Sequence, residues 1–213
     1  MNNPKIKIKQ TDLLSNNWYL LNNVTFDFLR KDGVWVTQKR EVYDRGNGAG
    51  ILLYNREQKT IILTRQFRLP AYLNGNETGM MVEVCAGLLD QDHPEQCIIR
   101  ETEEEIGVPA KQLIFVRSFT ELYIPPSNFM VYPFLAYSLE DLSFFPDPTE
   151  VAQIVEISLQ EFLENCPIAL QTRATSYNPE IEVPCFIIQG HEVWGATAMI
   201  LSELKETFKI LVQ

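Results

Sequence analysis

Three glutamates, Glu101, Glu104 and Glu105, lie close together in a segment that follows a glycine turn at Gly87. Each residue of an α-helix advances about 100° around the axis, so these carboxylates fall within an arc of roughly 100°, while Glu103 points to the far side. Mg²⁺ prefers oxygen ligands, keeps several waters and also accepts substrate phosphate oxygens. The spacing therefore predicts a divalent-metal site on one face of a short helix.

An ordinary solvent-exposed acidic face is the alternative interpretation of this spacing. Such a face would carry interspersed lysines, because like charges one turn apart destabilise a helix. The only basic residue in the segment is Arg100, so we favour the metal site. We expect Arg100 to pair with Glu104, four residues on, rather than to act in catalysis.

The ends of this helix are also marked in the sequence. Asp92 followed by Glu95 resembles a capping box, and Pro94 suits a first helical turn. Gly107 followed by Pro109 is typical of a helix end. An apolar stripe beside the acidic arc indicates that one edge of the helix packs on a core while the next edge faces a cleft.

The segment resembles the signature of the Nudix pyrophosphohydrolases: a glycine, an acidic residue, then Arg-Glu-x-x-Glu-Glu-x-Gly. The second half is complete here, from Arg100-Glu101 through Glu104-Glu105 to Gly107. In the first half, Gly87 stands one residue closer to Arg100 than in the commonest form, and Asp92 or His93 takes the place of the acidic residue. The resemblance implies an α/β (α+β) fold, an α/β/α sandwich around a mixed sheet.

Within the family, the chain resembles the GDP-mannose and ADP-sugar (ADP-ribose) pyrophosphatases over roughly residues 14–108. The segments that carry this likeness are Lys39–Gly48, Arg65–Arg68, Asn74–Glu77 and Glu83–Asp90. The tail instead resembles coenzyme A pyrophosphatases, at Glu150–Ala152 and Val193–Ala198, although their upstream motif is missing.

The resemblance implies Mg²⁺-dependent cleavage of the diphosphate bridge in a nucleotide sugar or ADP-ribose. A coenzyme A pyrophosphatase and a non-catalytic Nudix-like ligand sensor are the alternatives. Sensors of that kind depend on an attached DNA-binding domain, and this acidic chain has no basic recognition helix.

A set of site residues follows from the same resemblance. The metal, Mg²⁺ with Mn²⁺ as a substitute, would be held by the carbonyl of Ala86 with Glu101 and Glu105, and Glu104 would support a further ion. Glu150, on a later loop, would complete the site as base or ligand, so that Glu104, Glu105 and Glu150 form the catalytic set. The substrate-binding residues would be Trp18, Lys39, Arg40, Glu41, Arg68, Gly87 and Leu88.

Several of these residues have simpler interpretations. Trp18 lies in an apolar run and is either a stacking platform for the nucleobase or part of a core. Lys39 and Arg40 are either near the nucleotide or on a solvated hairpin edge. Residues three apart on a strand face opposite sides, so without a bend at most one of Arg65 and Arg68 can point at phosphate. The resemblance selects Arg68 for the diphosphate and leaves Arg65 as a structural residue.

The elements expected around this helix are mostly strands. An antiparallel β-sheet element over residues 1–46, with an Asp32-Gly33 hairpin turn, precedes a hydrolase domain over residues 47–213. By the resemblance, the first element is exchanged in a homodimer. Strands are expected at 51–54, 60–67, 80–85, 113–119, 130–138 and 152–157, and helices after Ser158 and over 196–211. Residues 166–190 show no clear pattern.

Composition limits the class of protein. The chain has 213 residues, is 46% hydrophobic and carries a net charge of −10, which argues against a nucleic-acid partner. We see no membrane-spanning stretch and no signal peptide. The cysteines, Cys85, Cys97, Cys166 and Cys185, show no metal-binding spacing and are expected to be reduced core residues of a cytoplasmic enzyme. Its small-molecule substrate would be a nucleoside diphosphate derivative.

Overall fold

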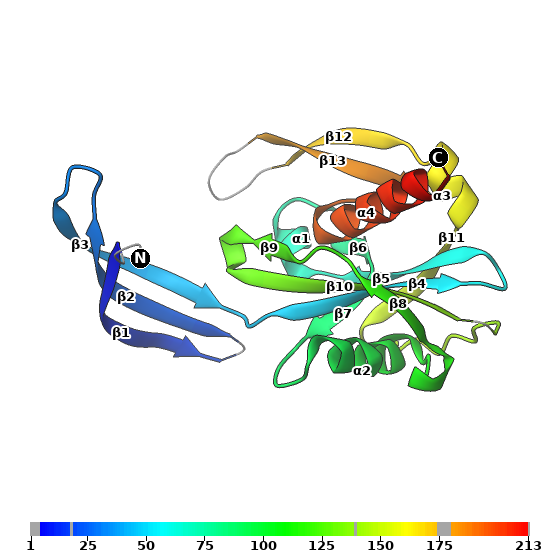
Figure 1. The fold of residues 1–213 in the computed structure, drawn as a ribbon, viewed down its shortest axis with the longest axis horizontal. Helices are drawn as coiled ribbons and strands as arrows, with labels where there is room; N and C mark the ends of the chain where they lie inside the picture. The colour runs from blue at the N-terminus through cyan, green and yellow to red at the C-terminus, as the bar shows by residue number, and fades with distance from the viewer. Residues whose placement is uncertain (1–4, 18, 139, 174–179, 213) are drawn as a thin grey trace. The chain divides into compact units, whose positions relative to one another are not determined.

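The computed structural model describes residues 5–17, 19–138, 140–173 and 180–212. The chain forms two compact units (Figure 1). The smaller unit comprises Met1–Asn47 and Tyr123–Met130. The larger unit comprises Gly48–Leu122 and Val131–Gln213.

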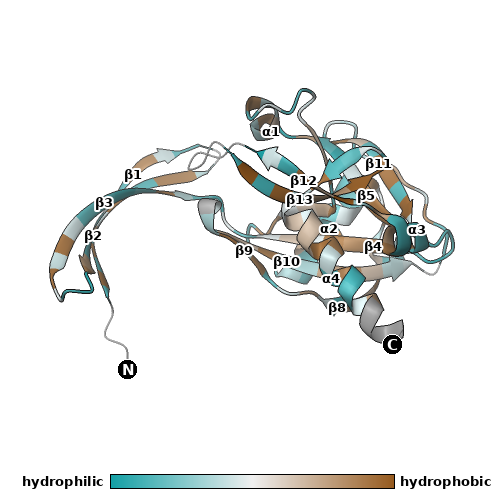
Figure 2. Cartoon of the chain, turned by 90° about the horizontal axis from the view of Figure 1, so that it is seen from above, coloured by the Kyte–Doolittle hydropathy of each residue, from teal (hydrophilic) through white to brown (hydrophobic). Residues whose placement is uncertain are grey.

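The smaller unit is built on a three-stranded antiparallel sheet in the order β1-β2-β3. Its strands are β1 (Ile6–Asn16), β2 (Leu20–Leu29) and β3 (Trp35–Asp44). The predicted turn between β2 and β3 is confirmed, because Gly33 has a φ of 83° and the Arg30 N–H donates to the Val34 carbonyl at 2.9 Å. Hydrophobic residues are scattered along all three strands (Figure 2).

The larger unit centres on an eight-stranded mixed sheet. Its main path is β11-β5-β4-β10-β8, with β6 paired to β5, β7 to β4 and β9 to β10. β4 and β10 run parallel, whereas β5 is antiparallel to β4, β6 and β11. The strands are β4 (Gly48–Asn55), β5 (Thr60–Phe67), β6 (Met80–Glu83), β7 (Cys85–Leu88), β8 (Ile114–Ser118), β9 (Leu122–Ile124), β10 (Phe129–Ser138) and β11 (Val151–Ser158).

Helices cover both faces of this sheet. The α-helices are α1 (Leu69–Leu73), α2 (Pro94–Ile106), α3 (Leu159–Asn165) and α4 (Gly195–Val212), and short 3₁₀ helices span Ala110–Gln112 and Pro125–Ser127. In Figure 1, α2 lies below the sheet and α4 above it. The predicted α/β/α sandwich around a mixed sheet is therefore confirmed. Ser158 caps α3 as expected, since its Oγ accepts from the Glu161 N–H at 3.4 Å.

Two parts of the larger unit differ from the sequence-based expectations. Residues 166–190, which showed no clear pattern, contain β12 (Ile168–Arg173) and β13 (Ile181–Ile188), which form a three-stranded antiparallel sheet with β14 (His191–Val193). Pro184 lies inside β13, which weakened the strand pattern. The strand expected at 80–85 is split at Val84 into β6, which pairs with β5, and β7, which pairs with β4.

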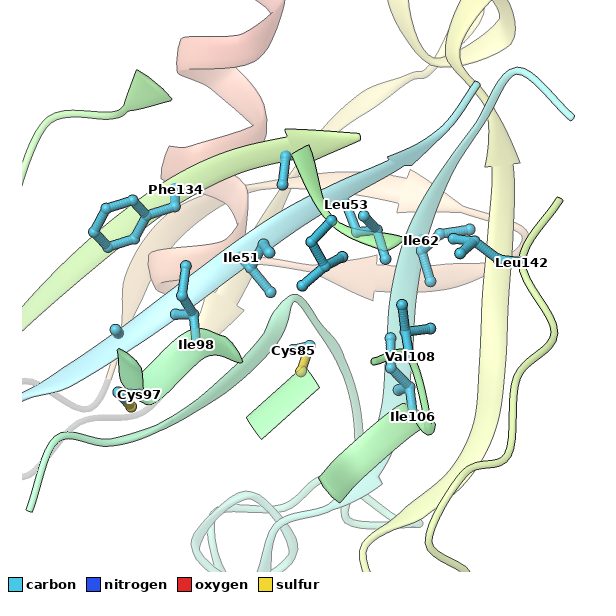
Figure 3. Packing of buried hydrophobic residues seen from close by; sticks show 13 residues of the cluster. Ile51, Leu53, Ile62, Cys85, Cys97, Ile98, Ile106, Val108, Phe134 and Leu142 are labelled. Carbon is cyan, nitrogen blue, oxygen red and sulfur yellow. The ribbon is translucent and has the colours of Figure 1, made fainter. Parts of the chain in front are cut away.

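The core that supports α2 lies between this helix and the sheet (Figure 3). Ile98 and Ile106 of α2 are fully buried and belong to the same cluster as Ile51 and Leu53 of β4. The four cysteines are buried free thiols, as expected. Among the described residues, no helix is long and apolar enough to cross a membrane.

Candidate active site

The glycine turn places backbone directly under a helix carboxylate. Gly87 lies on β7 opposite Ala49 of β4, and a Cβ added to it would overlap the carboxylate of Glu101. Only a glycine leaves room for this approach. The spacing of Gly87 and Glu101 in the sequence thus corresponds to a close contact between strand and helix.

Arg100 of α2 makes several hydrogen bonds with the helix and with the turn before it. Its Nε donates to Asp92 at 3.0 Å, and its Nη1 donates to Glu101 at 2.6 Å and to Glu104 at 3.1 Å. Its Nη2 donates to the Leu88 carbonyl at 3.2 Å. The predicted pair with Glu104 is therefore confirmed, and the contacts with Asp92 and Leu88 tie α2 to the preceding turn.

The start of α2 differs by one residue from the expectation. Its N-cap is His93, not Asp92, and the Gln96 side chain accepts from the His93 N–H at 3.4 Å. The Asp92 side chain is used by Arg100 instead. Gly107 ends the helix as predicted, with a φ of 72°.

Glu105 is the deeply buried member of the acidic set, with 3% of its surface exposed. Its Oε1 accepts from Gln66 Nε2 at 2.9 Å, while its Oε2 is buried and accepts no hydrogen bond from any described residue. Burial raises the pKa of Glu105, and the neighbouring Cys85 thiol and Gln66 amide oppose that shift. Burial likewise raises the pKa of Glu101, with Arg100 opposing it.

Glu104 lies in a different environment from Glu105. Its side chain is 61% exposed, and it accepts a hydrogen bond from Arg100 at 3.1 Å. An ion pair this exposed is screened by solvent. The helix therefore offers one exposed, one half-buried and one buried carboxylate from a single acidic face.

Arg68 lies at the end of β5 beside the acidic set. Its Nε and Nη2 donate to Glu83 Oε2 at 3.0 and 2.8 Å. Burial lowers the pKa of Arg68, but Glu83, with Glu105 and Glu150 acting through space, outweighs this and raises it. Arg65 has its Nε buried without a hydrogen-bond partner among the described residues, and its structural role stays a prediction.

Glu150 is held next to the helix end by its loop. The Asp147 N–H donates to the Glu105 carbonyl at 3.0 Å, and the Glu150 N–H donates to the Asp147 carbonyl at 3.1 Å. Val151, the next residue, pairs with Gln66 of β5. Glu150 is exposed, and its charge contributes to raising the pKa of Glu101.

Comparisons with known proteins decide the family. The family model described as the NUDIX domain matches residues 44–176, more than half of the chain. The chain belongs to the Nudix family. A second model, the GDP-mannose pyrophosphatase NudK N-terminal domain, matches residues 5–43. The resemblance inferred from the signature residues is therefore confirmed.

Curated relatives of this Nudix protein carry the name GDP-mannose pyrophosphatase. The protein from Yersinia pestis is 46% identical over 164 residues, which cover 75% of this chain and 81% of that protein. The protein from Citrobacter koseri is 51% identical over 124 residues, which cover 58% of this chain and 63% of that protein. The match to the second thus spans less than two thirds of its length.

Solved structures support the Nudix fold. The crystal structure of an ADP compounds hydrolase aligns with a TM-score of 0.57 at 16% identity, covering 99% of this chain and 98% of that one. A C. elegans Ap4A hydrolase aligns with a TM-score of 0.50 at 16% identity, covering 78% of this chain and 98% of that one. At these identities the likeness concerns the fold alone.

The remaining predicted substrate residues belong to the smaller unit. Lys39, Arg40 and Glu41 lie on β3, opposite residues 23–25 of β2. Lys39 Nζ lies 3.9 Å from Asp12, and Arg40 donates to the Lys39 carbonyl at 2.9 Å. Trp18 lies outside the described residues. Their roles at the nucleotide stay predictions.

The Nudix family implies a divalent cation, and the residues present fit one. Among the described residues, no three acidic, histidine or cysteine side chains gather into a ready-made metal site. The predicted set is different in kind, since it combines the backbone carbonyl of Ala86 with the carboxylates of Glu101 and Glu105. The buried Oε2 of Glu105 without a donor and the carboxylate held over Gly87 are the features that a cation would satisfy.

Two residues of this site were missed in the sequence. Gln66 bonds Glu105, and Glu83 holds Arg68. The sequence carried one usable signal for the first, because Thr64 and Gln66 are two residues apart on a strand and so place polar side chains on one face. Glu83 was part of a recognised segment, but nothing in its spacing linked it to Arg68.

Proposed function

We propose that this Nudix hydrolase is a Mg²⁺-dependent pyrophosphatase that cleaves the diphosphate bridge of a nucleotide sugar, with GDP-mannose as the first candidate. The proposed substrate rests on the match of residues 5–43 to the GDP-mannose pyrophosphatase NudK N-terminal domain. The 46% identity with a curated protein named GDP-mannose pyrophosphatase supports it. ADP-ribose and other nucleotide sugars remain within the proposed class.

The proposed division of labour follows the environments of the side chains. Ala86, Glu101 and Glu105 would hold the cation, and Mn²⁺ could replace Mg²⁺. The cation, when bound, neutralises phosphate oxygens and lowers the pKa of a water. The side chain of Arg68 is partly buried, and its guanidinium presents N–H donors in a rigid planar arrangement. These donors would bind the diphosphate once Arg68 exchanges Glu83 for the substrate.

Glu150 is the proposed general base. It is exposed on a loop tied to the end of α2, and it influences the pKa of both Glu101 and Arg68. It would take the proton from the water that attacks phosphorus, with Glu104 as a supporting carboxylate. Water adds to one phosphorus and the bridging oxygen leaves with the other, so that GDP-mannose would give GMP and mannose 1-phosphate.

The two alternatives have less support. Val193–Ala198, which resembled coenzyme A pyrophosphatases, begins α4, and its Thr197 Oγ accepts from the Val84 N–H at 3.3 Å in the interior. Trp194 is only half-buried, under the guanidinium of Arg173 at 4.4 Å. Helix packing accounts for this segment. The complete glutamate set argues against a non-catalytic sensor.

A homodimer is part of the proposal. None of the described residues of β1, β2 and β3 is fully buried. Apolar side chains on β1 are even largely exposed, Ile8 to 62% and Leu13 to 59%. A three-stranded sheet with apolar side chains but no interior of its own is stabilised by a partner surface. A second copy of the chain would supply that surface. The free, buried cysteines suit a cytoplasmic location.

Phosphate release tests the proposal. The purified chain is incubated with Mg²⁺ or Mn²⁺ and GDP-mannose, ADP-ribose, other nucleotide sugars or coenzyme A, and an added phosphatase converts the products to free phosphate. Phosphate from a blank without the chain is subtracted, because coenzyme A itself carries a phosphomonoester. We expect metal-dependent release that is fastest with a nucleotide sugar. Preference for coenzyme A, or no release from any compound, would reject the proposal. Light scattering on the same sample gives the mass, which for a monomer is 24.6 kDa.

A further inference from the structure

Gln66 has a buried amide side chain that hydrogen-bonds Glu105. It lies on β5 and is only 2% exposed. Its Nε2 donates to Glu105 Oε1 at 2.9 Å and to Thr64 Oγ1 at 3.3 Å. A primary amide has two N–H donors, and both are therefore used.

The orientation of this amide is fixed by chemistry. An ionised carboxylate can only accept hydrogen bonds, so the side of Gln66 that faces Glu105 must be the NH₂ group. The two oxygens of Glu105 are consequently unlike. Oε1 accepts from Gln66, whereas Oε2 is buried and makes no hydrogen bond of regular geometry with the described residues, and the Cys85 thiol lies beside the carboxylate.

The amide is also held in place from the other side. Thr64 is fully buried, and its Oγ1 lies 3.4 Å from the carbonyl of Glu83, to which it can donate. Gln66 itself pairs with Met81 on β6 and with Val151 on β11, so strands flank it on both sides. A chain of hydrogen bonds thus runs from a sheet carbonyl through Thr64 and Gln66 to the carboxylate.

We propose that Gln66 is a positioning residue for the divalent cation. By holding Oε1 of Glu105, it fixes the carboxylate so that the unpartnered Oε2 is the oxygen presented to the ion. This inference rests on the proposed function insofar as Glu105 is a metal ligand. Residues that hydrogen-bond metal ligands typically alter metal affinity or activity by about 10- to 100-fold when they are replaced.

The test uses Gln66→Met, because methionine has similar length and volume but no N–H donor. Titration of the full-length protein with Mn²⁺, followed by calorimetry or by the electron paramagnetic resonance of the free ion, gives the dissociation constant. We expect Mn²⁺ binding to be about 10- to 100-fold weaker than in the wild type. Turnover at subsaturating metal should fall with it, while KM for GDP-mannose stays unchanged.

Asn55→Leu is the matched control. Asn55 is a buried amide at the far end of β4, 1% exposed, whose Nδ2 donates to Asp141 at 3.3 Å and whose Oδ1 accepts from the Gln58 N–H at 3.2 Å. This variant loses a comparable buried amide away from Glu105, so its Mn²⁺ affinity should match the wild type. Thr64→Val keeps the Gln66 donors but removes their anchor, and should weaken Mn²⁺ binding in the same direction, though less.

The outcomes separate this inference from the proposed function. Mn²⁺ affinity within twofold of the wild type in Gln66→Met, or in Thr64→Val should the first variant not fold, would overturn the inference. Equal weakening in Asn55→Leu would overturn it too, since the effect would then be general loosening. If the wild type binds Mn²⁺ but cleaves no nucleotide sugar, the proposed function fails while the comparison of affinities still tests Gln66.

Discussion

Replacement of Gly87 by alanine should disable the site while leaving the fold intact. The added Cβ would fall on the carboxylate of Glu101, well inside the 3.0 Å that real Cβ contacts keep. The three atoms nearest to it are all side-chain atoms of Glu101, so we expect the carboxylate to move rather than the backbone. Gly87 is not among the glycines with positive φ, and alanine therefore fits its backbone.

The effect on stability is small when its terms are compared. Moving Glu101 off its rotamer costs about 0.5–1.5 kcal/mol, and its bond to Arg100 at 2.6 Å is weakened. Loss of glycine's freedom in the unfolded chain offsets about 0.4–1 kcal/mol. The balance is about 1 kcal/mol, a shift in Tm of roughly 2–4 °C at this chain length. A displacement of about 1 Å at a catalytic group can, by contrast, lower the rate about 100-fold.

Metal-dependent phosphate release from GDP-mannose and a thermal melt of the same sample measure the two effects. Gly190→Ala is the control, because Gly190 has a φ of 81° in the β13–β14 turn and nothing lies near its added Cβ. Strain there costs about 1–2 kcal/mol without touching the site. We expect Gly190→Ala to melt earlier at full activity. Gly87→Ala with near-wild-type kcat would refute the role of the carboxylate held over this glycine.

Three further predictions concern single groups. Glu105→Gln should abolish turnover but keep the fold. In the metal-free wild type, the pKa of Glu105 is raised on folding, so its stabilising contribution is complete below its unfolded pKa and is lost as pH rises through its folded pKa. The melting temperature should therefore change less between pH 4 and 8 in this variant than in the wild type. Arg68→Lys loses paired donors worth about 1.5–3 kcal/mol, and KM for GDP-mannose should rise about 10-fold or more with less change in kcat; an unchanged KM would remove Arg68 from the diphosphate. The four buried thiols should not react with Ellman's reagent at pH 8 until the protein is denatured, since burial raises their pKa values, that of Cys97 to about 11.

The sequence predicted the parts of the site that depend on local spacing. Helical periodicity placed Glu101, Glu104 and Glu105 on one face, and α2 carries them there. Gly107 ends that helix because a left-handed residue is needed, and this requirement is readable from one residue. Arg100 and Glu104 were paired correctly because they are one helical turn apart.

The missed parts depend on pairings between distant segments. Gln66 and Glu105 are 39 residues apart and meet only because β5 lies next to the end of α2. Arg68 and Glu83 meet through the β5–β6 register, which no local pattern specifies. The β12–β14 sheet was missed because a proline interrupts its middle strand. The capping position moved from Asp92 to His93 because the Asp92 carboxylate is engaged by Arg100, eight residues later.

The three glutamates of the acidic face differ in burial and in hydrogen bonding, and we expect these differences, rather than their places in the signature, to set their roles. Glu104 is exposed and pairs with the Arg100 guanidinium, so we expect it to attract a cation without holding it tightly. Glu101 is half-buried over Gly87, and Glu105 is buried with one oxygen bound by Gln66 and the other unsatisfied. Burial raises the pKa values of Glu101 and Glu105, and an oxygen of Glu105 lacks a regular donor. Both features lower the stability of the metal-free protein. Binding of a divalent cation would remove that penalty, so that melting temperature should increase with Mg²⁺ in the wild type and much less in Glu105→Gln.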